Sequence, residues 1–220
     1  MKSRTAGSPR FSSFLGVDWS GAKGKSHAGL QLAHARPGKS APLRVSPPLS
    51  KYWSRQQVFD YLVEMAENAK AKAPVLVGID FAFAHPFVDK DSYFPGIDMS
   101  PANALSLWAM VDQVNAGQPD LYGGAMFRHA LWGDYYLAPP TYQARHYASR
   151  RRITEMAARA AGRSPSPTFK AVGADNVSTG SLAGMRLLHR LKQQLGARLS
   201  VWPFDDIVTG QTNLVLVEIF

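Results

Sequence analysis

The sequence predicts an α/β protein built on a mixed β-sheet. Short apolar runs that suit buried strands lie before, between and after segments with helical spacing. Of the 220 residues, 45% are hydrophobic and only 19% are charged. That balance supports a packed core and is not typical of a disordered chain.

Six segments have the pattern of strands. We expect the first three to form an antiparallel meander, because turn residues separate runs in which apolar and polar residues alternate. The fourth is almost wholly apolar, which predicts a central strand buried on both faces. The segments are residues 14–18, 27–36, 42–47, 74–84, 199–204 and 213–220.

Four segments have helical spacing. Ser54 and Gln57 form the pattern of a capping box, which predicts the start of the first helix. Gly196 suits the end of the last helix. The expected helices begin at Ser54 and cover residues 100–116, 149–161 and 178–195.

The domain organisation is simple. Residues 1–13 are polar and basic, and we expect a flexible tail ahead of a single domain at 14–220. Within it, residues 85–147 carry eleven aromatic residues with scattered Gly and Pro. A connection of this length is uncommon in a compact domain. We therefore expect a helical, aromatic-rich insertion that serves as a cap or lid.

Several classes of protein do not fit this sequence. No apolar stretch approaches the roughly 20 residues of a membrane-spanning helix. The N-terminus lacks the apolar segment of a secretory signal. We therefore expect a cytoplasmic protein with no membrane partner. The absence of cysteine excludes disulfides, thiol catalysis and thiolate metal sites.

The formal net charge is +9. Residues 1–50 hold eight Lys or Arg against one Asp, and residues 151–220 hold nine against five acidic residues. Basic charge of this kind favours an anionic partner, and nucleic acid, DNA or RNA, is the expected one. A basic protein without a nucleic-acid role has the same composition, and the oligomeric state stays undecided.

Three apolar runs each carry one acid near the carboxyl end, namely Asp18, Asp80 and Glu218. A carboxylate is costly to bury unless it is paired, hydrogen-bonded or metal-bound. The carboxyl ends of parallel strands are the usual ligand site of an open α/β sheet, and carboxylate oxygens suit Mg²⁺ or Mn²⁺. Such ions activate water and stabilise a leaving oxygen in phosphodiester cleavage. The pattern predicts a divalent-metal-dependent nuclease with these acids as catalytic metal ligands; capping by each acid is the competing interpretation.

These three segments also carry a family resemblance. Residues 16–21, 78–82 and 217–220 resemble the signature segments of the family called domain of unknown function 429, described as predicted ribonuclease H-like nucleases. Residues 172–175 and 178–184 are similar to bacterial members. The resemblance implies a ribonuclease H-like fold whose five strands lie in the order 3-2-1-4-5, flanked by helices. It places the three acids near a metal centre.

The sequence departs from that family at one point. In the family, the strand with the glutamate runs on into a helix that supplies a fourth carboxylate, whereas this sequence ends at Phe220. By residue type alone, Asp175 and Asp205 are the substitutes.

Seven residues are candidates for phosphate contact. The turn after the first strand can present backbone N–H groups to a phosphate. The N-terminus of the helix at residue 178 favours anions, although an ordinary N-cap is the alternative. Arginines at the start of the helix near residue 150 oppose the helix dipole, so they meet either an anion or solvent. The candidates are Ser20, Gly21, Arg151, Arg152, Lys170, Thr179 and Ser181.

Other functions remain open. An ATP-dependent phosphotransferase of actin-like fold shares the core topology, and a non-catalytic nucleic-acid-binding domain would keep the fold without the chemistry. Gly24-Lys25-Ser26 matches only part of a P-loop, because Trp19 stands where that motif needs Gly. Aromatic rings of the insertion either stack nucleic-acid bases or fill its core. His85 either approaches the acids or is an ordinary loop residue.

Overall fold

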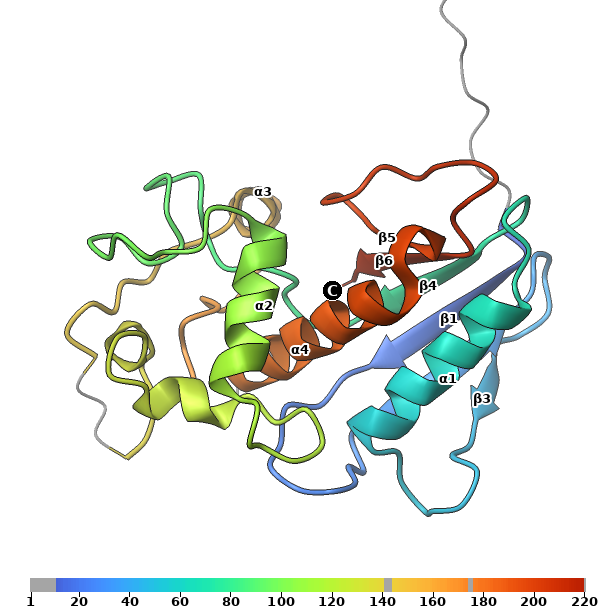
Figure 1. The fold of residues 1–220 in the computed structure, drawn as a ribbon, viewed down its shortest axis with the longest axis horizontal. Helices are drawn as coiled ribbons and strands as arrows, with labels where there is room; N and C mark the ends of the chain where they lie inside the picture. The colour runs from blue at the N-terminus through green and yellow to red at the C-terminus, as the bar shows by residue number, and fades with distance from the viewer. Residues whose placement is uncertain (1–10, 141–143, 174–175, 220) are drawn as a thin grey trace, which may run out of the picture.

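The computed structural model describes residues 11–140, 144–173 and 176–219 and has an α/β architecture with a mixed six-stranded sheet (Figure 1). All six predicted strands are confirmed, and most are shorter than expected. Their bounds are β1 Ser13–Asp18, β2 Gln31–Ala35, β3 Leu43–Val45, β4 Val75–Ile79, β5 Leu199–Val201 and β6 Leu214–Glu218.

The sheet corrects the expected strand count and order. The observed order is β3-β2-β1-β4-β6-β5. As expected, β1 is antiparallel to β2 and parallel to β4, but β6 lies between β4 and β5 and is parallel to both. Leu214, Val215 and Leu216 are fully buried, so a position with partners on both sides suits β6. The three-residue β5 takes the edge, where a short strand leaves few unpaired backbone groups.

The four predicted helices are confirmed. Ser54 and Gln57 form the expected capping box at the start of α1, and Gly196 ends α4 with a φ of 55°. Helices α1 and α4 lie side by side across one face of the sheet (Figure 1). The bounds are α1 Arg55–Asn68, α2 Ala104–Val114, α3 Ile153–Ala160 and α4 Ser178–Leu195.

Alternation along the strands gives the sheet two unequal faces. Val17 and Ile79 are paired neighbours in β1 and β4 and are almost fully buried under the helices. Gly16 and Gly78 occupy the alternate positions, which belong to the opposite face, and both are half-buried. The Ile219 side chain lies over Gly78. A step of one residue along a strand therefore decides which face a side chain joins.

The insertion at 85–147 forms the left-hand part of the molecule in Figure 1, where α2 packs across α4. It also holds two short 3-10 helices, η1 Gly124–Arg128 and η2 Gly133–Tyr135. Much of its aromatic content is buried and packs around Phe169 and His85, so these rings belong to the core and are not open to nucleic-acid bases. The buried rings include Tyr93, Phe94, Trp108, Trp132, Tyr135 and Tyr136.

His85 lies inside this aromatic cluster and does not approach the acids. Its ring nitrogens bond the Thr168 hydroxyl at 2.9 Å and the Tyr136 hydroxyl at 2.8 Å, and its ring stacks on Phe169. Burial, together with the charges of Arg152 and Arg150, lowers the pKa of His85 from 6.5 to about 3.

This burial predicts acid sensitivity. Between about pH 6.5 and pH 3 the unfolded chain binds a proton at His85 that the folded protein does not, so stability falls as the pH drops through this window. We expect His85→Gln to be less stable at neutral pH, by about 1–3 kcal/mol for the disturbed hydrogen bonds. Its stability should then decline less steeply towards pH 4. Urea unfolding at several pH values measures both effects, with His34→Gln on β2 as the control; an unchanged slope would contradict the assignment.

No helix within the described residues is long and apolar enough to cross a membrane. Of the predicted tail, residues 1–10 lie outside the described part of the chain, and Ser13 already belongs to β1.

Candidate functional site

Asp18 and Asp80 come together at the carboxyl edge of the sheet. Asp18 ends β1, and Asp80 directly follows β4. Their preceding residues, Val17 and Ile79, are register partners, and the Asp80 amide donates to the Val17 carbonyl at 3.0 Å. Neighbouring strands lie about 4.8 Å apart. Both side chains line one hollow of about 390 Å³ on the open face of the sheet. The expected convergence of these two acids is therefore present.

The electrostatics of Asp80 reflect this crowding. Partial burial raises the pKa of Asp80 above its ordinary value, and the nearby negative charges of Asp18 and Glu218 raise it further. A carboxylate in this position is destabilised when ionised, and a bound cation would relieve the repulsion.

Glu218 belongs to the opposite face. Its register partner is Ile79, so its side chain lies on the face of the sheet that the helices cover. Asp18 and Asp80 come one position after the paired residues Val17 and Ile79. Its Oε1 accepts from Arg152 Nη2 at 2.6 Å, and its Oε2 accepts from Arg152 Nη1 at 2.6 Å and from the Phe83 amide at 2.9 Å. The structure thus places Glu218 near the aspartate pair while both of its oxygens are already engaged.

Arg152 is held by a second carboxylate as well. Its Nε donates to Glu155 Oε1 at 2.8 Å, and its backbone amide donates to Glu155 Oε2 at 2.9 Å, which closes the start of α3. The Glu155 side chain is buried. A local capping requirement, which the run of arginines in the sequence does not reveal, therefore accounts for much of the placement of Arg152.

The neighbouring arginines also have partners inside the protein. Arg150 donates to both oxygens of Asp89 and to three backbone carbonyls between residues 86 and 93. Arg151 donates to the backbone carbonyl and the hydroxyl of Ser149. Of the three arginines, Arg150 ties the start of α3 to the insertion, and Arg152 ties it to β6.

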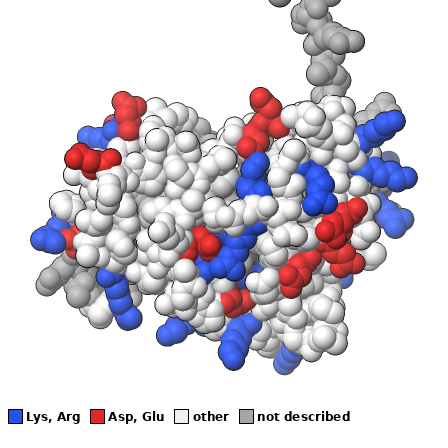
Figure 2. Space-filling view, in the orientation of Figure 1, with Lys and Arg blue, Asp and Glu red and all other residues white. Residues whose placement is uncertain are grey.

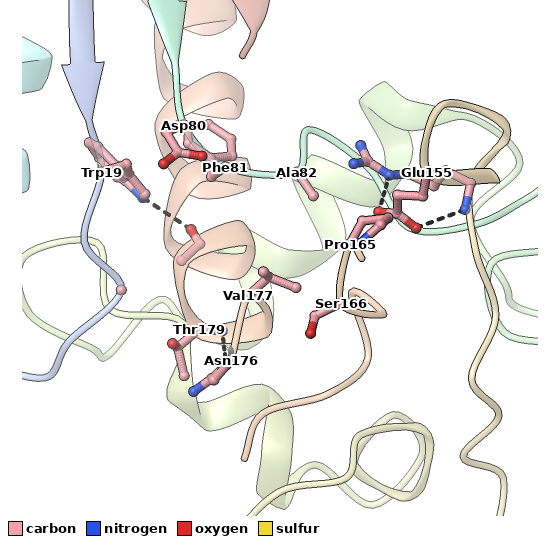
Figure 3. Close-up of a pocket in the computed structure, with 13 residues that line it drawn as sticks. Trp19, Asp80, Phe81, Ala82, Glu155, Pro165, Ser166, Asn176, Val177 and Thr179 are labelled. Carbon is pink, nitrogen blue, oxygen red and sulfur yellow. Dashed lines mark hydrogen bonds and ion pairs between the residues drawn. The ribbon is translucent and has the colours of Figure 1, made fainter. Parts of the chain in front are cut away.

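A cleft of about 250 Å³ adjoins the aspartate pair on the helix side (Figure 3). Asp80 and Trp19 lie on one side of it, and Glu155 and Pro165 lie on the other. The start of α4 lines it through Val177, Thr179 and Gly180, and Arg152 also reaches it. Asp80 lines both the cleft and the hollow, so it stands at the junction of the two.

The turn after β1 is packed tightly against the start of α4. A Cβ atom added at Gly21 would lie 2.1 Å from the Gly180 nitrogen, so only glycine fits there. The Trp19 ring nitrogen donates to the Gly180 carbonyl at 3.0 Å. Gly21 and Thr179, two predicted phosphate contacts, therefore both line the cleft.

Three other predicted phosphate contacts, Ser181, Ser20 and Lys170, are less well placed to meet a phosphate in the cleft. Ser181 is buried, and its hydroxyl donates to the Val177 carbonyl of its own helix. The Ser20 carbonyl accepts from Arg55. Lys170 bridges to Leu137 through its backbone and does not line the cleft.

Arg55 is an organising residue that the sequence patterns did not single out. It is the first residue of α1, and its side chain is fully buried. Its Nη1 donates to the Ser20 and Ala22 carbonyls at 2.7 and 3.0 Å, and its Nε donates to the Asp120 carbonyl at 2.6 Å. The Asp120 carboxylate contacts His27 at 3.0 Å and lies 3.6 Å from the guanidinium. This network clamps the turn after β1 against the loop that follows α2.

The structure also bears on the P-loop and on the two substitute acids, Asp175 and Asp205. Residues 19–30 are all described and contain no helix, whereas a P-loop requires one. Asp205 pairs with Lys192 at 2.9 Å and accepts from the Val201 amide, so it serves the end of β5. Asp175 lies outside the described residues. Within the described ranges, no group of three or more acidic or histidine side chains has an arrangement that could hold a metal ion.

Comparison of the chain with protein-family models, with curated proteins and with solved structures finds no match. The class established by the fold and the site is therefore an α/β protein with two aspartates at the carboxyl edge of a mixed sheet.

Proposed function

We propose that this protein is a divalent-metal-dependent phosphodiesterase that acts on nucleic acid, with a ribonuclease H-like fold related to the domain of unknown function 429 family. The observation that carries the proposal is the juxtaposition of Asp18 and Asp80 on adjacent parallel strands. Asp18, Asp80 and Glu218, one from each segment that resembles the family, lie at the carboxyl ends of β1, β4 and β6. The strand arrangement β3-β2-β1-β4, with β1 parallel to β4, agrees with the proposed fold as far as β4.

The two aspartates have the chemistry of a divalent-cation site. Both are oxygen donors that line one hollow, and the pKa of Asp80 is raised by burial and by the carboxylates beside it. Mg²⁺ in proteins keeps several waters and is often held by only one or two carboxylates. Bound there, Mg²⁺ or Mn²⁺ would supply an activated water and stabilise the leaving oxygen. Asp18 and Asp80 would hold and orient the ion.

The adjoining cleft supplies features that suit a phosphate ester. The N-terminus of α4 opens on it through Thr179 and Gly180, and helix N-termini favour anions. The turn after β1, with Gly21 on the cleft wall, carries Lys23 and Lys25, both exposed. Elsewhere the basic side chains are dispersed: on the face shown in Figure 2 they lie in several places, interspersed with acidic ones.

The placement of these lysines predicts which charges meet the nucleic acid. Lys23→Gln and Lys25→Gln should each make the slope of log affinity against log salt shallower by about one. Each substitution removes one phosphate contact, so fewer counterions are released when the nucleic acid binds. Lys70→Gln and Lys72→Gln are the matched controls, since these exposed lysines precede β4 at the opposite edge of the sheet. Fluorescence anisotropy with a labelled oligonucleotide over a salt series measures the slopes. Equal effects at both edges would indicate binding without a defined site.

One assay separates the proposed function from its alternatives. Labelled single-stranded and duplex DNA and RNA are incubated with the protein in Mg²⁺, Mn²⁺ or EDTA, each with and without ATP. We expect cleavage that needs the metal and ignores ATP. Consumption of ATP would favour the phosphotransferase. Binding without cleavage, unaffected by Asp18→Asn or Asp80→Asn, would favour a non-catalytic nucleic-acid-binding domain.

A further inference from the structure

Glu218 and Arg152 form a bidentate ion pair near the aspartate pair. The guanidinium meets the carboxylate end-on, with 2.6 Å contacts to both oxygens. The Phe83 amide fixes Oε2 of the same carboxylate from a third direction. The two side chains are 12% and 15% exposed, so water screens the pair only weakly.

Resting on the function proposed above, we propose that Arg152 takes the place of a second metal ion, so that the site holds one divalent cation, bound by Asp18 and Asp80, with Glu218 kept out of its coordination. Two-metal phosphodiesterases spread both cations over a shared set of carboxylates. In this protein Glu218 would complete such a set, and the Arg152 guanidinium already pairs with it.

Register supports the separation. Glu218 pairs with Ile79, whereas Asp18 and Asp80 each follow the paired residues Val17 and Ile79 by one position. Because side chains alternate along a strand, Asp18 at the end of β1 lies on the face of the sheet opposite Glu218. Asp80 follows the end of β4 and lies where that open face meets the cleft. To move to the face on which Asp18 lies, Glu218 would have to leave both Arg152 and the Phe83 amide.

That release would be costly. Breaking a buried pair leaves an uncompensated charge, and the penalty corresponds to a loss of about 100-fold to 4000-fold in the affinity of any ion that required it. Arg152 cannot be neutralised to ease the exchange. Burial alone would lower its pKa, but the hydrogen bonds and charges of Glu218 and Glu155 raise it above the ordinary value.

The count of bound ions tests the proposal. Equilibrium dialysis against Mn²⁺ at neutral pH should give one Mn²⁺ per chain for the wild-type protein. Glu218→Gln keeps the shape of the side chain and removes its charge. Because Glu218 would not be a ligand of the ion, this variant should still bind one Mn²⁺, with a loss in affinity below about tenfold. Glu64→Gln, an exposed acid of α1, is the matched control. Asp80→Asn should weaken binding at least tenfold.

Arg152→Gln provides the converse test. It frees Glu218 and Glu155 from their shared cation, so a second, weaker Mn²⁺ should appear, while Arg152→Lys should retain a single ion. If Arg152→Gln does not fold, the Glu218→Gln result decides alone, with thermal unfolding confirming that this variant is folded.

The outcomes distinguish the two proposals. Two Mn²⁺ in the wild-type protein, or a loss of tenfold or more in affinity in Glu218→Gln, would overturn the role of Arg152 and leave the metal site intact. No Mn²⁺ bound by the wild-type protein, or binding indifferent to Asp80→Asn, would overturn the proposed function itself.

Discussion

Asp80→Asn should lower the rate of the proposed metal-dependent hydrolysis by several orders of magnitude, because it removes the charge of a proposed ligand where the hollow and the cleft meet. In the absence of metal the same substitution should leave thermal stability unchanged or raise it. Ionised Asp80 is crowded by Asp18 and Glu218, and an amide relieves that repulsion. Mg²⁺ should then no longer raise the melting temperature. Asp18→Asn should behave in the same way.

The choice of control depends on the structure. Asp89 is unsuitable, because both of its oxygens accept from Arg150 and its neutralisation would disturb that pair. Asp91 is exposed and has a positive φ of 49°, which asparagine tolerates well. Asp91→Asn should change neither stability nor the response to Mg²⁺. A metal-free loss of stability in Asp80→Asn, with a normal Mg²⁺ response, would show that Asp80 is a structural acid.

Arg55→Met should give a large loss of stability, about 3–5 kcal/mol. It leaves the buried Asp120 carboxylate without its cation and the Ser20 and Ala22 carbonyls without a donor. For a chain of this size that loss corresponds to a fall in melting temperature of roughly 6–20 °C. Arg55→Lys keeps the charge but not the planar set of donors, so its stability should lie between those of the wild-type protein and Arg55→Met.

Urea denaturation measures the Arg55 effect directly. Arg159→Met, at an exposed position of α3, is the control and should change the free energy of unfolding by less than about 0.5 kcal/mol. Because the clamp holds the turn that carries Gly21, Arg55→Met should also weaken oligonucleotide binding at temperatures where it remains folded. A loss below 1 kcal/mol would mean that the Asp120 network does not stabilise the turn.

The sequence alone was sufficient for the elements and for the aspartate pair. Strong local signals, such as the Ser54–Gln57 capping box and the apolar runs that end in Asp18 and Asp80, were confirmed in position. The parallel pairing of β1 with β4, which the family resemblance implied, brings together two matched runs, each an apolar strand followed or closed by an acid. Each acid occupies the same place in its run, so this pairing brings both acids to one edge of the sheet.

The partners of the charged groups were decided by the tertiary structure. Glu218 has the same sequence pattern as the two aspartates, yet its register partner is the residue before Asp80, so it faces Arg152 on the other side of the sheet. Arg55 and Asp120 are 65 positions apart, and nothing local marks either of them. The order of β5 and β6 likewise depends on which strand can satisfy two neighbours. Local sequence determines periodicity, caps and turns, whereas long-range pairing of charges and strands is fixed only when the chain packs and burial makes each unpaired group costly.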